Sequence, residues 1–239
     1  MIPKKIHYFW FGGKPIPAKY QKYIQTWKKY CPDYEIIRWD ESNYDCTKNE
    51  FLRAAYEARK WAFVTDYARL DVVNQYGGVY LDTDVELIKP LDEMMDYQAF
   101  AGFECSGYVA FGLGFGSEAN NVQLQEMLDA YSDISKFVDE EGNFKTDLTC
   151  PIVQTGILEK HGLVKNNQRQ NVEGFEIFPE EYFCPMNYSF EYNNLTENTI
   201  SIHHYAASWF STKDRLKFHI INKLSRNYKM FKRLLVKNK

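Results

Sequence analysis

The stretch Val64–Glu86, VTDYARLDVVNQYGGVYLDTDVE, predicts a helix, a helix stop and a short strand in direct succession. Apolar residues recur at steps of three and four across Ala62–Tyr76, a spacing that places them on one buried helical face. Gly77–Gly78 supplies the left-handed turn that ends such a helix. The run Val79–Leu81 then predicts a strand that carries Asp82–Asp84 to the carboxyl edge of a sheet, where open α/β sheets bind ligands.

The sequence before this stretch predicts the start of a parallel sheet. Ile6–Phe11 (IHYFWF) is an apolar and aromatic run closed by two glycines, which is typical of a buried strand. Apolar residues in Tyr20–Tyr30 again keep helical spacing, and Pro32 ends the helix. Tyr34–Trp39 (YEIIRW) predicts a second strand. A strand, a helix and a strand at this spacing indicate a parallel-sheet α/β domain.

The C-terminal half gives weaker signals. Glycines alternate with apolar residues in Phe103–Gly116, which indicates strands and loops in close backbone contact. Asp133–Asp147 is polar and predicts a loop with a short helix, whereas Ile177–Asn187 predicts an extended segment around its two prolines. The last residues, 213–239, are basic and place their apolar residues at helical spacing. We therefore expect one large domain over residues 1–212, followed by a basic amphipathic tail.

Composition favours a cytoplasmic protein with ring-lined pockets. The chain has 239 residues, of which 45% are hydrophobic, and this is enough for a sizeable core. A net charge of -3 argues against a nucleic-acid partner, and 17% aromatic residues suit stacking on sugars or bases. The five cysteines form no close pair of the metal-binding or redox type, so we expect reduced thiols. The sequence contains neither a secretion leader nor a long apolar span, which predicts a cytoplasmic location.

Two carboxylates at positions i and i+2 after a short strand suit a hard divalent cation, which takes oxygen ligands and shares them with substrate phosphates. Asp82 and Asp84 have this arrangement, although acidic pairs also occur in solvated turns. Asp66 and Arg69 lie three residues apart on the preceding helix and face the same sheet edge. An ordinary ion pair within the helix is the alternative for them. Paired aspartates and a metal also fit a nucleotidyltransferase or phosphoesterase.

Three separated blocks resemble the DXD glycosyltransferases of family 32. They are Ile2–Gly13 (IPKKIHYFWFGG), Val64–Glu86 and Ile202–Trp209 (IHHYAASW), in the expected order. This family includes bacterial capsule and lipopolysaccharide sugar transferases and yeast initiating mannosyltransferases, and the glucosylating domains of large clostridial toxins are related to it. The resemblance implies a GT-A fold, which is a Rossmann-like α/β architecture with a mostly parallel central sheet, and retention of anomeric configuration.

The resemblance also implies roles for the matching residues. Asp84 would bind Mn²⁺ or Mg²⁺ directly, and Asp82 would help to hold the ion and the donor. His203 or Ser208 would be a further metal ligand. In an extended segment His203 and His204 cannot both face the site, and the family pattern favours His203. A lone buried histidine without such a pattern is more often structural. The candidate donor-binding residues are Phe9, Trp10, Asp66, Arg69, Tyr80, Asp82, Ser208 and Trp209, and the candidate catalytic residues are Asp82, Asp84 and Arg69.

Leu148–Gly156 (LTCPIVQTG) departs from the T-G-P run of many members, so we assign no acceptor-side residue there. Trp10 falls where the toxin relatives stack a uracil, which favours a UDP-hexose donor, with GDP-mannose as the second choice. The expected acceptor is a saccharide or a lipid-linked oligosaccharide in the synthesis of a capsule or another surface polysaccharide. The basic tail predicts peripheral contact with the inner face of a membrane, unless it packs on the domain. A homologue that binds a nucleotide sugar without transferring it is a further alternative.

Overall fold

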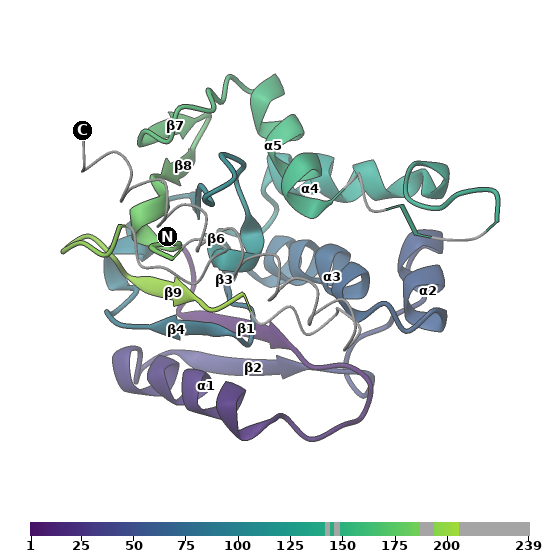
Figure 1. Ribbon diagram of the computed structural model, residues 1–239, viewed down its shortest axis with the longest axis horizontal. Coiled ribbons are helices and arrows are strands. Elements are labelled where there is room, and N and C mark those ends of the chain that lie inside the picture. The colour runs from purple at the N-terminus through teal and green to yellow at the C-terminus, as the bar shows by residue number, and fades with distance from the viewer. Residues whose placement is uncertain (142–143, 146–148, 187–193, 206–239) are drawn as a thin grey trace, which may run out of the picture.

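A seven-stranded sheet forms the centre of the computed structural model, which describes residues 1–141, 144–145, 149–186 and 194–205 (Figure 1). Its strands are β1 (Lys5–Phe9), β2 (Glu35–Trp39), β3 (Gly78–Tyr80), β5 (Ala99–Gly102), β6 (Phe115–Ser117), β7 (Gln170–Val172) and β8 (Phe175–Phe178). Their order across the sheet is β2-β1-β3-β6-β5-β8-β7. Five of them run in one direction, whereas β6 and β7 are antiparallel to their neighbours. The prediction of a mostly parallel α/β sheet is therefore confirmed, with two reversed strands that it did not include.

Five α-helices in the described part of the chain surround this sheet (Figure 1). They are α1 (Ala18–Tyr30), α2 (Glu50–Glu57), α3 (Trp61–Tyr76), α4 (Val122–Asp129) and α5 (Cys150–Lys160). The helices predicted before Pro32 and before Gly77 are confirmed as α1 and α3. The hydrophobic pattern of the sequence does not predict α2 and α4. These helices begin where the side chains of Asn49 and Asn121 accept hydrogen bonds from backbone N–H groups of the first turn.

Gly77 and Gly78 join α3 to β3 at a point where neighbouring residues leave no room for a Cβ atom. Their φ angles are 63° and 111°, in the region that favours glycine. A Cβ atom on Gly78 would lie 2.9 Å from the carbonyl oxygen of Lys5, in the neighbouring strand β1. The two glycines therefore let β3 pair with β1 directly after the helix. This connection places Asp82–Asp84 at the carboxyl end of β3.

The alternation of side chains along the strands sorts the core into two clusters, one on each face of the sheet. Phe9 and Tyr80 belong to the cluster that includes buried residues of α2, α3, α4 and α5. Tyr8 and Val79, their neighbours in the chain, belong to the opposite cluster with Trp27 of α1. Because both faces of the sheet are covered, a ligand site is expected at the ends of the strands.

A second, two-stranded sheet packs against α1. Its strands β4 (Val85–Leu87) and β9 (Ser201–His203) are antiparallel, with Val85 opposite His203 (Figure 1). The indole N–H of Trp27 in α1 donates to the carbonyl oxygen of Val85 at 2.8 Å, which anchors the pair. The sequence pattern does not predict the pairing of β4 with β9. This pairing brings His203 next to the loop that holds the two aspartates.

Several predictions for the C-terminal half need correction or fall outside the described residues. The segment 177–187 is not extended throughout, because β8 is followed by the 3-10 turn η5 (Glu180–Tyr182). The polar segment 133–147 contains the 3-10 turn η4 (Ile134–Lys136), in keeping with the predicted short helix. The predicted basic tail, residues 213–239, lies outside the described residues. No helix that the structure describes is long and apolar enough to cross a membrane.

Candidate active site

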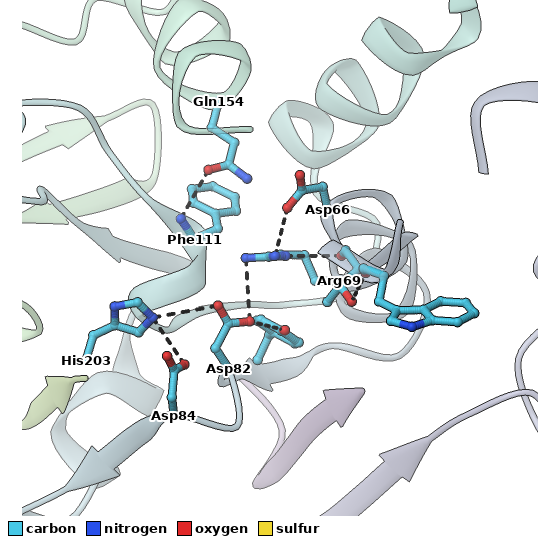
Figure 2. Close-up of polar contacts among 10 residues, drawn as sticks. Asp66, Arg69, Asp82, Asp84, Phe111, Gln154 and His203 are labelled. Atoms are coloured by element: carbon cyan, nitrogen blue, oxygen red, sulfur yellow. Dashed lines mark hydrogen bonds and ion pairs between the residues drawn. The ribbon is translucent and has the colours of Figure 1, made fainter. Parts of the chain in front are cut away.

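Asp82 and Asp84 lie between β3 and β4, at the carboxyl edge of the central sheet (Figure 2). The backbone N–H of Val85 donates to the carbonyl oxygen of Asp82 at 3.0 Å and closes this loop. His203 approaches from β9, with its Nε2 atom 3.2 Å from Asp84 Oδ1 and 3.8 Å from Asp82 Oδ2. The structure thus brings together the three residues predicted as metal ligands.

The geometry of these three side chains fits a divalent cation. One ligand atom of each lies within 4.8 Å of the others. Ligand atoms bound at right angles and about 2.1 Å from one ion are about 3 Å apart, which is close to the distances from His203 to the two carboxylates. Two carboxylates and one imidazole form a donor set that suits Mn²⁺ or Mg²⁺ in the presence of substrate phosphates. Asp82, Asp84 and His203 can therefore hold such an ion.

The charge of His203 supports the same interpretation. Burial alone would lower the pKa of its imidazole, but the carboxylates of Asp84 and Asp82 outweigh burial and raise the pKa to about 10. The imidazolium form places positive charge between the carboxylates, and a cation bound there would replace the proton on Nε2. His204 faces the other side of β9, where its Nε2 atom lies 2.8 Å from Glu86 Oε2 and its ring stacks on Tyr23. Of the two neighbouring histidines, His203 is the one that faces the aspartates.

Arg69 connects the helix α3 to this loop. Its Nη2 atom lies 2.8 Å from Asp66 Oδ1, and its Nη1 atom lies 3.8 Å from Asp82 Oδ1 (Figure 2). Its Nε–H also donates to the carbonyl oxygen of Thr65. Burial raises the pKa of the Asp66 carboxyl, and the charge of Arg69 partly opposes this rise. Asp66 and Arg69 are therefore more than an ion pair within one helix, because the guanidinium group also reaches toward the acidic loop.

Tyr80, the last residue of β3, holds the side chain of Asp82. Its hydroxyl donates a hydrogen bond to Asp82 Oδ1, and the guanidinium carbon of Arg69 lies 5.0 Å from the centre of its ring. Burial and the charge of Asp82 raise the pKa of this hydroxyl, so it stays protonated and remains a donor. The side chain is only 1% exposed. The structure thus shows Tyr80 in contact with Asp82, and its predicted role in donor binding stays a prediction.

Comparison with known proteins agrees with this geometry. Residues 17–101 match the family described as "Glycosyltransferase sugar-binding region containing DXD motif". Inositol phosphoceramide mannosyltransferase 3 of Schizosaccharomyces pombe is 32% identical over 103 residues, which are 41% of this chain and 29% of that protein. Mannosyl phosphorylinositol ceramide synthase SUR1 of Saccharomyces cerevisiae is 32% identical over 104 residues, which are 42% and 27%. The matched region spans less than a third of either yeast protein.

Among solved structures, the PaToxG Glycosyltransferase superposes with a TM-score of 0.53 and 21% identity, covering 66% of this chain and 69% of that one. The chain therefore contains a glycosyltransferase sugar-binding region with a DXD motif. Its fold is of the GT-A type, with helices around a central sheet and the DXD loop directly after β3.

The structure places the aromatic residues predicted to bind the donor in different surroundings. Phe9 is buried in the core and stacks on Phe11. Trp10 is partly exposed, and its indole N–H donates to the carbonyl oxygen of Lys14 at 2.6 Å while its ring packs near Tyr20. A stacking role for Trp10 therefore stays a prediction. Ser208 and Trp209 lie outside the described residues.

One residue without a predicted role, Gly112, lies close to the acidic loop, and the side chain of Gln154 holds the turn that contains it. Gly112 is in the 3-10 turn η2 (Phe111–Leu113), and a Cβ atom there would lie 2.8 Å from Asp82 Oδ2 and 3.0 Å from Arg69 Nη1. The backbone N–H of Phe111 donates to the side-chain oxygen of Gln154 in α5 at 3.1 Å (Figure 2). The alternation of glycine and apolar residues around Gly112 indicates close contacts, but it does not say with which residues.

Proposed function

We propose that this chain transfers a hexose, with retention of configuration, from a nucleotide-sugar donor to a saccharide or lipid-linked acceptor in the synthesis of a surface polysaccharide. The observation that carries the proposal is the position of Asp82. One of its carboxylate oxygens faces Arg69 and Tyr80, and the other faces His203. This aspartate joins a cluster suited to a cation and diphosphate to a cluster suited to sugar hydroxyls.

The side chains of both clusters have complementary tasks in this reaction. A divalent ion at Asp82, Asp84 and His203 would stabilise the negative charge that develops on the leaving diphosphate. Arg69 adds a permanent positive charge beside the same group, and its burial strengthens this effect. Asp66, held by Arg69, offers a carboxylate oxygen to hydroxyls of the donor sugar. Together these residues bind and orient the donor and neutralise the leaving group.

The nucleotide of the donor has two candidates. Trp10 is partly exposed beyond the carboxyl end of β1, which supports base stacking and hence a UDP-hexose. The names of the two yeast relatives refer to mannosyl transfer, and this supports GDP-mannose. Titration calorimetry with UDP and GDP in the presence of Mn²⁺ distinguishes them. Tighter binding of GDP would overturn the UDP assignment.

The decisive test is the substitution Asp84→Asn. Release of nucleotide diphosphate from a panel of nucleotide sugars should fall at least ~10²-fold, because one electrostatic stabiliser of the leaving group is lost. The melting temperature should stay close to that of the wild type. Glu86→Gln is a matched control, since Glu86 lies on β4 but faces His204 on the opposite side. EDTA should abolish turnover, and Mn²⁺ should restore it.

Three results would contradict this proposal. Wild-type turnover in Asp84→Asn, or no effect of EDTA, would mean that the acidic loop holds no catalytic ion. Release of a nucleoside monophosphate would favour a phosphoesterase. Binding of donor without any turnover, across a broad acceptor panel, would favour a non-catalytic homologue.

We further propose a cytoplasmic location at the inner face of a membrane. The support is the composition of residues 213–239, which hold ten of the 29 lysines and arginines but only one of the 32 acidic residues. Clustered cations of this kind are attracted to anionic lipids. A lipid-linked acceptor would then be within reach of the enzyme.

A further inference from the structure

The side-chain amide of Gln154 is buried, and only one of its two ends has a partner. The residue is 0% exposed. Its Oε1 atom accepts a hydrogen bond from the backbone N–H of Phe111 at 3.1 Å. Its Nε2 atom is buried and has no hydrogen-bond partner among the residues that the structure describes. A buried donor without an acceptor destabilises the folded state, so it calls for a functional explanation.

Helix α5 directs this amide toward Asp66 and Arg69, which we call the donor cluster because they are proposed to bind the nucleotide-sugar donor. The thiol of Cys150, at the start of α5, hydrogen-bonds the carboxylate of Asp66. Gln154 follows four residues later and therefore lies on the same face of the helix. Figure 2 shows its side chain extending from α5 toward the side occupied by Asp66 and Arg69. The free amide nitrogen thus belongs to the surroundings of the donor cluster.

The bond to Phe111 fixes the direction in which the amide nitrogen points. Because Oε1 is held by the Phe111 N–H, the amide cannot turn over without losing that bond. The next residue, Thr155, holds the same segment, because its hydroxyl oxygen accepts from the Val109 N–H at 2.9 Å. Both contacts also position Gly112, the residue that fits closely against Asp82 and Arg69. The donor hydrogens of Gln154 are therefore held in place before any ligand binds.

We propose that Gln154 determines sugar specificity by donating a hydrogen bond from Nε2 to one hydroxyl of the transferred hexose. This inference rests on the proposed function. A hydroxyl between Gln154 and Asp66 would accept from the neutral amide and donate to the carboxylate, which satisfies both protein groups at once. A hexose that lacks this hydroxyl, or carries it in the other configuration, leaves the buried Nε2 atom of Gln154 without a partner. Sites of this kind reject the wrong sugar strongly.

The test compares the binding of nucleotide alone with the binding of nucleotide sugar. In Mn²⁺, Gln154→Met should bind UDP or GDP as the wild type does, but should bind the matching nucleotide hexose roughly tenfold more weakly. The control is Gln123→Met, another buried amide, whose Nε2 already donates to the carbonyl oxygens of Val172 and Glu173. The control should lower the melting temperature and leave both affinities unchanged.

A panel of monodeoxy hexose donors identifies the hydroxyl. Wild-type affinity should drop for one monodeoxy donor, and Gln154→Met should not distinguish that donor from the parent. Equal weakening of the binding of nucleotide and of nucleotide sugar in Gln154→Met would show that Gln154 only supports the fold. Wild-type affinity of Gln154→Met for both ligands would show that Gln154 does not contact the sugar. If the wild type binds neither nucleotide nor nucleotide sugar, the proposed function itself fails.

Discussion

Asp82 uses both oxygens of its carboxylate. Oδ1 accepts the hydrogen bond of Tyr80 and faces Arg69, whereas Oδ2 faces His203 and lies next to Gly112. Any displacement of this one side chain therefore moves a proposed metal ligand and a neighbour of Arg69 together. At the scale of single residues, the position of Asp82 therefore depends on a neighbour without a side chain, Gly112.

Gly112→Ala tests this dependence. The added methyl group would lie 2.8 Å from Asp82 Oδ2 and 3.0 Å from Arg69 Nη1, so one of these charged groups must shift. A misplacement of about 1 Å in an active site costs on the order of 10²-fold in rate. We expect kcat/KM for donor and acceptor to fall by about this factor, measured by nucleotide release.

Gly156→Ala is the matched control for this substitution. Gly156 lies inside α5 and has nothing within 4 Å of an added Cβ atom. Alanine there should raise the free energy of unfolding by up to about 1 kcal/mol, because alanine has the higher helix propensity, and should leave the rate unchanged. Wild-type kcat/KM in Gly112→Ala would show that the close contact of Gly112 with Asp82 and Arg69 does not contribute to catalysis.

At the scale of elements, local signals predicted the parts of the site that follow one another in the chain. The spacing in α3, the glycine stop and the short strand β3 place Asp66, Arg69 and Asp82 at one sheet edge, and the structure confirms these elements. The pairing of β4 with β9 has no such signal, because each strand is three residues long and its partner is far away in sequence. His203 was therefore predicted only through the family resemblance. Gln154 was missed because it lies in a run that departs from the family pattern.

His7 in β1 links three elements and should make the fold sensitive to acid. Its Nδ1 atom accepts from the Trp39 indole of β2, and its Nε2–H donates to the carbonyl oxygen of Gly77 after α3. The bond from Trp39 requires an unprotonated Nδ1 and therefore the neutral imidazole, and burial lowers the pKa of His7 to about 4. The stabilisation is therefore complete above the unfolded-state pKa of about 6.5 and is lost as the pH falls toward 4.

Urea unfolding at pH 7 and pH 4.5 measures this effect. The wild type should lose about 2 kcal/mol of its free energy of unfolding between these pH values through His7 alone. In His7→Gln, which cannot titrate in this range, the loss should be smaller by that amount. An identical pH dependence in both proteins would mean that His7 is not the group responsible.

At the scale of the whole molecule, charge is distributed unevenly along the chain. The sequence before the tail carries nearly all of the acidic residues, whereas residues 213–239 are strongly basic. Each cation close to an anionic bilayer contributes on the order of 1 kcal/mol to binding. The full chain should therefore sediment with anionic vesicles and not with neutral ones, and binding should weaken as the salt concentration rises.

Removal of residues 213–239 should abolish this sedimentation, because the remaining chain is acidic and is repelled by the same lipids. Donor turnover with a soluble acceptor serves as the control for an intact site. Equal binding of the full and the shortened chain would contradict a role of the tail in membrane contact.

The pairing of β4 with β9 also sets an order of events during protein synthesis. Glu86 and His204, neighbours across this small sheet, are 118 residues apart in the chain. A ribosome therefore completes the loop with both aspartates long before it makes His203. Domains can begin to fold during translation, so the early part of the sheet can form before His203 is made. The proposed cation site of a nascent chain is thus incomplete until late in translation.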